Sequence, residues 1–109
     1  MGKRDFLGEF ELLILLAILR LKDQAYGMRI RQEIEESCDR ETAIGSVYLT
    51  LERLEEKGFV ESILGEATEV RGGRAKRFFS VNRSGREVLR RSLRAVSNLA
   101  EGLTILGTS

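Results

Sequence analysis

The stretch from Thr42 to Lys57 presents one short polar face whose side chains are suited to contact with nucleic-acid bases. Read at helical spacing, this face carries Ser46, Leu49, Thr50 and Arg53. Hydroxyl groups and a forked guanidinium hydrogen-bond base edges, and a leucine packs on a thymine methyl group. A helix with these groups on one side and apolar residues on the other fits a DNA major groove. An ordinary amphipathic surface helix is the alternative for this stretch taken alone.

The opposite face of the same stretch is apolar and predicts that the helix packs on a core. Its residues recur at helical spacings and are Ile44, Val47, Tyr48, Leu51 and Leu54. We expect Thr42 to cap the start through its hydroxyl, and Gly58 to end the helix in a left-handed conformation. Tyr48 is expected mainly in the core, with its hydroxyl reaching toward a phosphate.

Arg53 has two interpretations. Its guanidinium can bind a guanine edge through two parallel hydrogen bonds. It can instead pair with Glu52 or Glu56 on the same helix, which would make it an ordinary surface residue. We favour the role in base reading.

Two short apolar stretches after this helix predict a β-hairpin. The strands are expected at Phe59–Leu64 and Lys76–Val81, and the connecting segment Gly65–Ala75 contains a Gly-Gly pair that permits a turn. The basic residues expected to hold DNA phosphates there are Arg71, Arg74, Lys76 and Arg77. A solvated surface hairpin is the alternative for this region in isolation.

Charge is distributed unevenly along the 109 residues, although the net charge is only +1. The acids gather in Glu33–Glu36 and Glu52–Glu56, whereas Glu87 is the only acid between Arg71 and Arg94. The basic residues of that second segment are Arg71, Arg74, Lys76, Arg77, Arg83, Arg86, Arg90, Arg91 and Arg94. A near-neutral total therefore conceals a basic face of the kind that binds nucleic acid.

Three further helices are predicted around these elements. Residues 6–21 are apolar nearly all round, which favours burial of one side against a partner subunit. A helix from about Tyr26 to Ser37, followed by the turn Cys38–Glu41, completes a helix-turn-helix. Ser84 and Glu87 form a capping box for a last helix with a heptad seam. The residues predicted to form the dimer interface are Phe10, Leu13, Ile14, Ala17, Leu89, Leu93, Val96, Ala100 and Leu103.

Composition argues against catalysis. The chain has no histidine, one cysteine, no cluster of metal ligands and no glycine-rich phosphate motif, so we expect neither an enzyme nor a cofactor or metal. The single cysteine, Cys38, excludes an internal disulfide and favours a reducing compartment; a redox-sensing role is the less favoured alternative to burial. The apolar run Leu12–Leu19 is too short for a membrane span and no cleavage site follows it, so we expect a cytoplasmic protein.

Four segments of the sequence carry a resemblance to one family. They are LGEFELLILLAIL at residues 7–19, AYGMRIRQEIEE at 25–36, IGSVYLTLERLEEKGFVES at 44–62 and RGGRAKRFFSVNRSGREVL at 71–89. In order and spacing the chain resembles the PadR family of bacterial transcriptional regulators. The resemblance covers nearly the whole chain. This chain has a single C-terminal helix and no tryptophan, so the aromatic-drug site of some relatives is not carried over.

The resemblance implies a mainly α fold with a small β-hairpin, a winged helix-turn-helix flanked by N- and C-terminal dimerisation helices. Residues 1–83 would form the DNA-binding domain and residues 84–109 the dimerisation helix. It implies a homodimer that binds an inverted-repeat operator in double-stranded DNA, usually as a repressor. The family's wing motif falls on Gly72, Gly73 and Arg74. A small-molecule effector at the dimer interface is a further expectation, and a winged helix used only for protein interaction is the alternative function.

Overall fold

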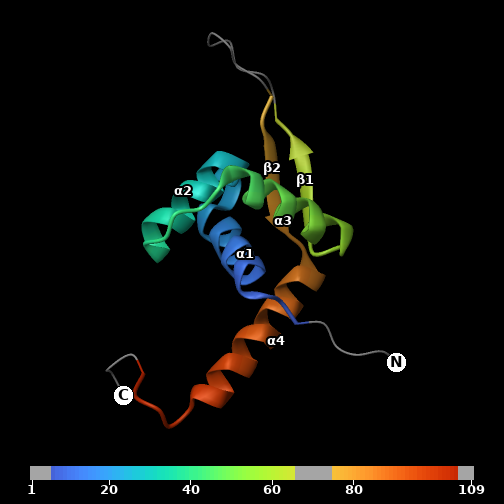
Figure 1. Cartoon of the computed structure of the whole chain (residues 1–109). Coiled ribbons are helices and arrows are strands. Elements are labelled where there is room, and N and C mark those ends of the chain that lie inside the picture. Colours follow the sequence, from blue (N-terminus) through green and yellow to red (C-terminus); the bar gives the residue numbers. More distant parts are fainter. Residues whose placement is uncertain (1–5, 66–74, 106–109) are drawn as a thin grey trace.

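The computed structural model describes residues 6–65 and 75–105, and within them it contains four α-helices and a two-stranded antiparallel sheet. The elements are α1 (Glu9–Leu21), the 3-10 turn η1 (Lys22–Gln24), α2 (Gly27–Cys38), α3 (Ile44–Glu56), β1 (Val60–Leu64), β2 (Arg77–Val81) and α4 (Arg83–Ala100). Figure 1 shows α2 and α3 gathered around α1, the hairpin beside them, and α4 extending away from the group. This is the mainly helical winged helix-turn-helix that the sequence predicts.

Helix α1 lies at the centre of the core because its apolar residues cover nearly its whole circumference. It packs against α2, α3, β2 and α4, and Leu15 and Ile18 are buried. The chain's own elements therefore cover much of the surface that the sequence assigned to a partner subunit. Ile14 and Ala17 were predicted at the dimer interface, and this is corrected because both are buried inside their own chain.

The start of α1 differs from the prediction because the preceding residues are tied down in extended form. The helix begins at Glu9 and not at residue 6. The Leu7 N–H donates to Ser92 Oγ at 2.9 Å, and the Gly8 N–H donates to Glu11 Oε1 at 2.9 Å. These bonds fix the N-terminal segment against α4 and satisfy an amide that the helix itself leaves unpaired.

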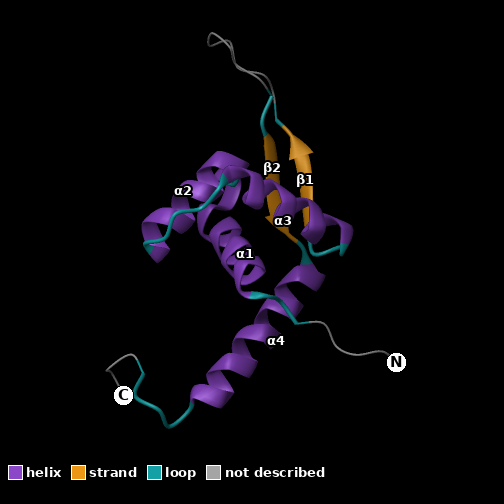
Figure 2. Ribbon diagram, in the orientation of Figure 1, coloured by secondary structure: helices purple, strands orange, loops and turns teal. Residues whose placement is uncertain are grey.

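The hairpin pairs β1 with β2 in register from Val60↔Val81 to Leu64↔Arg77 (Figure 2). Val60, Phe79 and Val81 are buried and join the core. The segment before α2 lies along the free edge of β2, because the Phe79 N–H donates to the Ala25 carbonyl at 2.8 Å. The hairpin is thereby held to the helix-turn-helix through the middle of β2.

Helix α4 is capped by Asn82, and the predicted cap at Ser84 is wrong. The helix starts at Arg83, so Ser84 lies inside its first turn, while Asn82 Oδ1 accepts a hydrogen bond from the Gly85 N–H at 2.9 Å. Asn82 Nδ2 also donates to the Gly58 carbonyl at 2.9 Å. A side chain at Gly85 would collide with the Phe59 carbonyl oxygen. The start of α4 is therefore fixed to the end of α3.

Two residues of the predicted heptad seam do not lie on the exposed apolar side of α4. Leu89 is buried in the chain's own core, so its assignment to the dimer interface is corrected. Leu103 follows the end of α4 at Ala100, because the helix stops before Gly102, which has a φ of 86°. The seam is thus shorter than the sequence spacing suggested.

Candidate nucleic-acid interface

The C-terminal end of α3 is fixed by a glycine-dependent cap. Gly58 has a φ of 83°, the left-handed conformation predicted for it. The Gly58 N–H donates to the Glu55 carbonyl at 3.0 Å, and the Phe59 N–H donates to the Leu54 carbonyl at 2.9 Å. This pair of bonds is the Schellman arrangement, and it turns the chain sharply from α3 into the hairpin.

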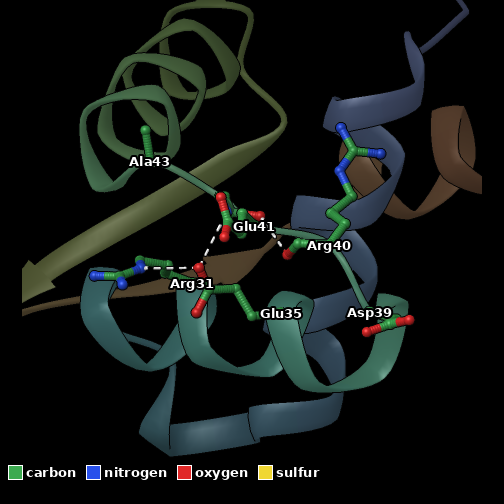
Figure 3. A pocket seen from close by; sticks show the side chains of 7 residues that line it. Arg31, Glu35, Asp39, Arg40, Glu41 and Ala43 are labelled. Carbon is green, nitrogen blue, oxygen red and sulfur yellow. Dashed lines mark hydrogen bonds and ion pairs between the residues drawn. The ribbon is translucent and has the colours of Figure 1, made fainter.

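The N-terminal end of α3 is held by Glu35 from α2, and Thr42 is not the cap. The residue at the cap position is Ala43, and the Thr42 hydroxyl donates to the Arg40 carbonyl at 3.3 Å. Figure 3 shows Glu35 between α2 and the α2–α3 turn, where it accepts from the Thr42 N–H at 3.0 Å and pairs with Arg31 at 3.4 Å. These residues line an open cavity of about 730 Å³, and the bond between Glu35 and the Thr42 N–H holds the chain at the start of α3.

The outward side of α3 is rotated relative to the face predicted from the sequence. Ser46, Leu49 and Arg53 are exposed as expected, with Leu49 at 57%. Thr50 is only 6% exposed and packs toward the core, so its predicted contact with bases is corrected. Glu52 is exposed in the same turn and was not among the predicted site residues.

Tyr48 lies at the surface and not in the core. Its side chain is 48% exposed, and its ring lies so close to Gly27, the first residue of α2, that no side chain fits there. The phenol is therefore held beside the first turn of α2, where unpaired amides favour an anion. The part of the prediction that placed Tyr48 in the core is wrong, and its exposed position agrees with its inclusion among the candidate DNA contacts.

A groove of about 530 Å³ separates α3 from the hairpin. Its walls include Tyr48, Leu49 and Glu52 from α3 and Arg77 from β2. The same outward side of α3 thus offers apolar, hydroxyl and charged groups along one concave surface. Such a mixture matches the donor, acceptor and methyl groups displayed along a DNA major groove.

Arg53 forms no ion pair with any residue in the described part of the chain. Among them, no carboxylate lies within 4.0 Å of its guanidinium, so the predicted alternative pairing with Glu52 or Glu56 is not formed.

Glu11 interacts with both Lys57 and Arg53, and Lys57 Nζ pairs with Glu11 Oε2 at 3.0 Å. Burial of Glu11 raises its pKa, but the Gly8 N–H, Lys57 and the positive charge of Arg53 outweigh burial and lower the pKa overall.

The loop end of the hairpin, where Leu64 pairs with Arg77, presents two of the predicted phosphate-binding residues. Lys76 is exposed, with its ammonium 4.4 Å from the centroid of the Tyr26 ring. Arg77 is also exposed, and its Nη1 donates to Ser62 Oγ at 3.1 Å. Arg71, Gly73 and Arg74, like Gly72, lie outside the described residues.

The remaining predicted dimerisation residues fall into two groups. Phe10 and Leu13 on α1 are half-buried against the core. Leu93 and Val96 on α4 are exposed, Val96 at 62%, and Ala100 is half-buried at the helix end. Leu99, which is 85% exposed, widens this apolar side of α4.

The described part of the chain holds neither a membrane-spanning helix nor a metal-binding cluster. No helix there is both long and apolar enough to cross a membrane. No group of three or more His, Cys, Asp or Glu side chains there is placed to hold a metal ion. Cys38 was expected to be a small buried residue, and this is wrong because it is exposed at the end of α2.

Solved structures of transcriptional regulators share this fold. A regulator from Clostridium thermocellum is 19% identical and aligns over 84% of this chain and 85% of that chain, with a TM-score of 0.69. A PadR family regulator from Clostridium difficile R20291 is 28% identical over 85% and 95%, with a TM-score of 0.63. A PadR-like regulator from Bacillus cereus strain ATCC 14579 is 22% identical over 85% and 92%, with a TM-score of 0.65. No curated protein matches the chain.

The family assignment rests on the sequence match, which spans the elements described above. The model of the transcriptional regulator PadR-like family matches residues 15–91. This range runs from within α1 to within α4 and contains all of α2, α3 and the hairpin. The chain therefore belongs to the PadR-like family of transcriptional regulators.

Proposed function

We propose that this regulator binds double-stranded DNA sequence-specifically as a homodimer and acts as a repressor in the cytoplasm. As a member of a family of transcriptional regulators the chain is not an enzyme. The proposal assigns base reading to α3 and phosphate binding to the hairpin. Within it we keep the predicted division of labour, with residues 1–83 for DNA and residues 84–109 for dimerisation.

The main support for the proposal is the set of exposed side chains on the outward side of α3. Ser46, Leu49 and Arg53 are exposed together, and no described carboxylate lies within 4.0 Å of the Arg53 guanidinium. A planar guanidinium binds guanine O6 and N7 at once, which is the commonest specific contact between a protein and DNA. The cap at the C-terminal end of α3 and the bond from Thr42 to Glu35 before its N-terminal end hold the helix in place, and a rigid helix positions such a contact reproducibly.

The phosphate contacts are assigned to Lys76 and Arg77 at the loop end of the hairpin and to Tyr48 on α3. All three side chains are exposed on elements that border the α3 groove. Arg71, Gly73 and Arg74 remain predictions for the rest of the wing. Contacts to phosphates fix the register of a protein on the duplex without selecting sequence.

Dimerisation is assigned to the apolar side of α4, with Phe10 and Leu13 of α1 at its edge. Leu93, Val96 and Leu99 are exposed on a helix whose apolar side no described element covers beyond Ser92. A twofold dimer presents two equivalent α3 helices, so we expect an inverted repeat with half-sites about 10 base pairs apart or a multiple of that. Footprinting of a single asymmetric half-site would contradict this arrangement.

A small-molecule effector, if the regulator has one, is proposed to act at this dimer interface. A ligand bound between the two copies changes DNA affinity only if it binds two arrangements of the α3 helices with different affinity. Effector response should then be lost when interface residues such as Leu93 are changed. An intact response in several such variants would contradict the proposal.

The experiment that tests the proposed function is a gel-shift assay with the region upstream of the protein's own operon. We expect a shift at protein concentrations that leave a scrambled duplex of equal length unbound. The matched variant is Arg53→Ala, which should lose the preference for the upstream region. A folded protein that shifts neither duplex would support the alternative, a winged helix used for protein interaction.

A further inference from the structure

Glu52 occupies an unexpected place for an acid on a protein proposed to bind DNA. It is exposed on the outward side of α3 and lines the groove between α3 and the hairpin, together with Tyr48, Leu49 and Arg77. Glu52 lies three residues after Leu49 and Arg53 lies four residues after it, so each charged side chain neighbours Leu49 on the helix surface. Any duplex that contacts Leu49 and Arg53 therefore also approaches the Glu52 carboxylate.

The Glu52 carboxylate, like that of Glu56 on the same helix, has no hydrogen-bond or ion-pair partner among the described residues. Glu9, Glu11, Glu33 and Glu35 each pair with a cation, and Glu55 accepts a hydrogen bond from Ser62. No hydrogen bond or ion pair within the described part of the chain engages Glu52. Its position is thus not explained by a role in holding the fold together.

Electrostatics makes this position costly for general DNA binding. A carboxylate near a duplex is repelled by the phosphates whatever the sequence. The repulsion is offset only where the carboxylate accepts a hydrogen bond from a base. In the major groove the suitable donor is the N4 amino group of cytosine. Adenine also has an amino group, but its neighbouring N7 is an acceptor that repels a carboxylate.

We propose that Glu52 is a specificity-determining residue that reads a cytosine in each half-site, beside the guanine read by Arg53. The inference rests on the proposed function and names one base that the operator must contain. Glu52 then acts mainly by rejecting sites without the cytosine. An exposed residue of this kind adds selectivity at the expense of overall affinity.

The test is selection of bound sequences from a library of randomised duplexes, performed with the wild-type protein, Glu52→Gln and Glu56→Gln. Glu56 is the matched control because it is exposed one turn later on α3 and does not line the groove. Both changes keep the shape of the side chain and remove one negative charge, and both residues are exposed, so the fold should be unaffected. Urea unfolding of each variant checks this.

We expect wild-type sites to share a cytosine at one fixed position of each half-site, and Glu56→Gln sites to keep it. In Glu52→Gln the preference for cytosine over the other bases should fall roughly tenfold. Glutamine reads adenine N6 and N7, so the preferred base at that position should move toward adenine.

The inference is overturned if Glu52→Gln binds every duplex more tightly by one common factor with its base preferences unchanged, because Glu52 would then only repel. It is also overturned if Glu56→Gln relaxes the same position. Failure of the proposed function is distinguishable, since the wild-type protein would then enrich no sequence at all.

Discussion

Two groups of cations in this chain differ in what they contact. In the first group each cation has a carboxylate partner: Arg20 and Arg29 pair with Glu33, Arg31 with Glu35, Arg40 with Glu9, and Lys57 with Glu11. In the second group no carboxylate of the described residues lies within 4.0 Å. It includes Arg53 on α3, Lys76 at the loop end of the hairpin, and Arg86, Arg90 and Arg94 on α4.

The difference separates structural charges from charges available to a partner. Pairs such as Arg20–Glu33 and Lys57–Glu11 connect α1 with α2 and with the end of α3, so they help to position α3. Arg86, Arg90 and Arg94 follow one another at four-residue intervals on an exposed side of α4, where like charges repel. Unpaired cations are suited to a polyanion, and among them Arg53 and Lys76 lie in the part of the chain that the proposed function assigns to DNA.

The largest effect is expected from placing a charge on the apolar side of α4. Val96→Asp should convert the proposed dimer to monomers, because it buries an unpaired carboxylate in the interface at a cost of several kcal/mol. Val96 is exposed in the single chain, so the monomer should remain folded. The control is Asn98→Asp, four residues after Arg94 on the arginine side, which should leave the dimer intact. Sedimentation that shows an unchanged dimer for Val96→Asp would refute the interface.

The next largest effect is expected on DNA affinity when one cation from each group is replaced by alanine. Arg53→Ala should weaken binding to the operator by about 1–3 kcal/mol and relax preference at one position of each half-site. Arg31→Ala should change operator binding by less than about 0.5 kcal/mol, because Arg31 pairs with Glu35 on the same helix. Titrations against operator and scrambled duplexes measure both. Equal losses for the two variants would remove the distinction between the groups.

A smaller effect concerns the pH dependence of stability. The pKa of Glu11 is lowered in the folded chain, so this group stabilises the fold above its unfolded pKa and loses that contribution as the pH falls through its folded pKa. Glu11→Gln should cost about 1–2 kcal/mol at neutral pH and reduce the acid sensitivity. Glu9→Gln is the control, since its side chain is 75% exposed and its pair with Arg40 should contribute little. Urea unfolding at neutral and acidic pH measures the unfolding free energy of both variants. Equal values for the two variants at each pH would contradict this prediction.

The smallest effect is expected within α4. Arg90→Gln removes two like-charge contacts at four-residue spacing and should stabilise the chain by about 0.2–0.5 kcal/mol. Arg31→Gln removes an attractive pair of the same spacing on α2 and should destabilise the chain by a similar amount. Unfolding free energies that shift in the same direction for both variants would count against the unpaired state of the α4 arginines.

Much of the fold was predictable because its signals are local. The periodicity of Val47, Leu51 and Leu54, with Gly58 after them, defines α3 and its end closely. What periodicity does not give is the exact rotation of a helix. Thr50 lies at the border of the apolar face, and contacts with the other helices turn it inward while Tyr48 remains exposed. The predicted base-reading face was therefore displaced, and it omitted Glu52.

Other errors arose where several residues compete for one role. Asn82 and Ser84 are both good helix caps, and Asn82 is the cap in the structure, where it also binds the Gly58 carbonyl. Helix α1 is apolar all round, and a sequence does not state how many of its sides the chain itself will cover. Ile14 and Ala17 are buried because α2, α3, β2 and α4 surround α1.

The most direct test of the account is the salt dependence of duplex binding, measured by fluorescence anisotropy for the wild-type protein, Lys76→Gln and Arg31→Gln. Release of counterions from phosphates makes the logarithm of the binding constant fall linearly with the logarithm of salt concentration. We predict a steep negative slope for the wild-type protein, a slope reduced by about two per dimer for Lys76→Gln, and no change for Arg31→Gln. A flat wild-type slope, or equal slopes in all three proteins, would contradict the claim that unpaired cations face DNA while paired cations hold the fold.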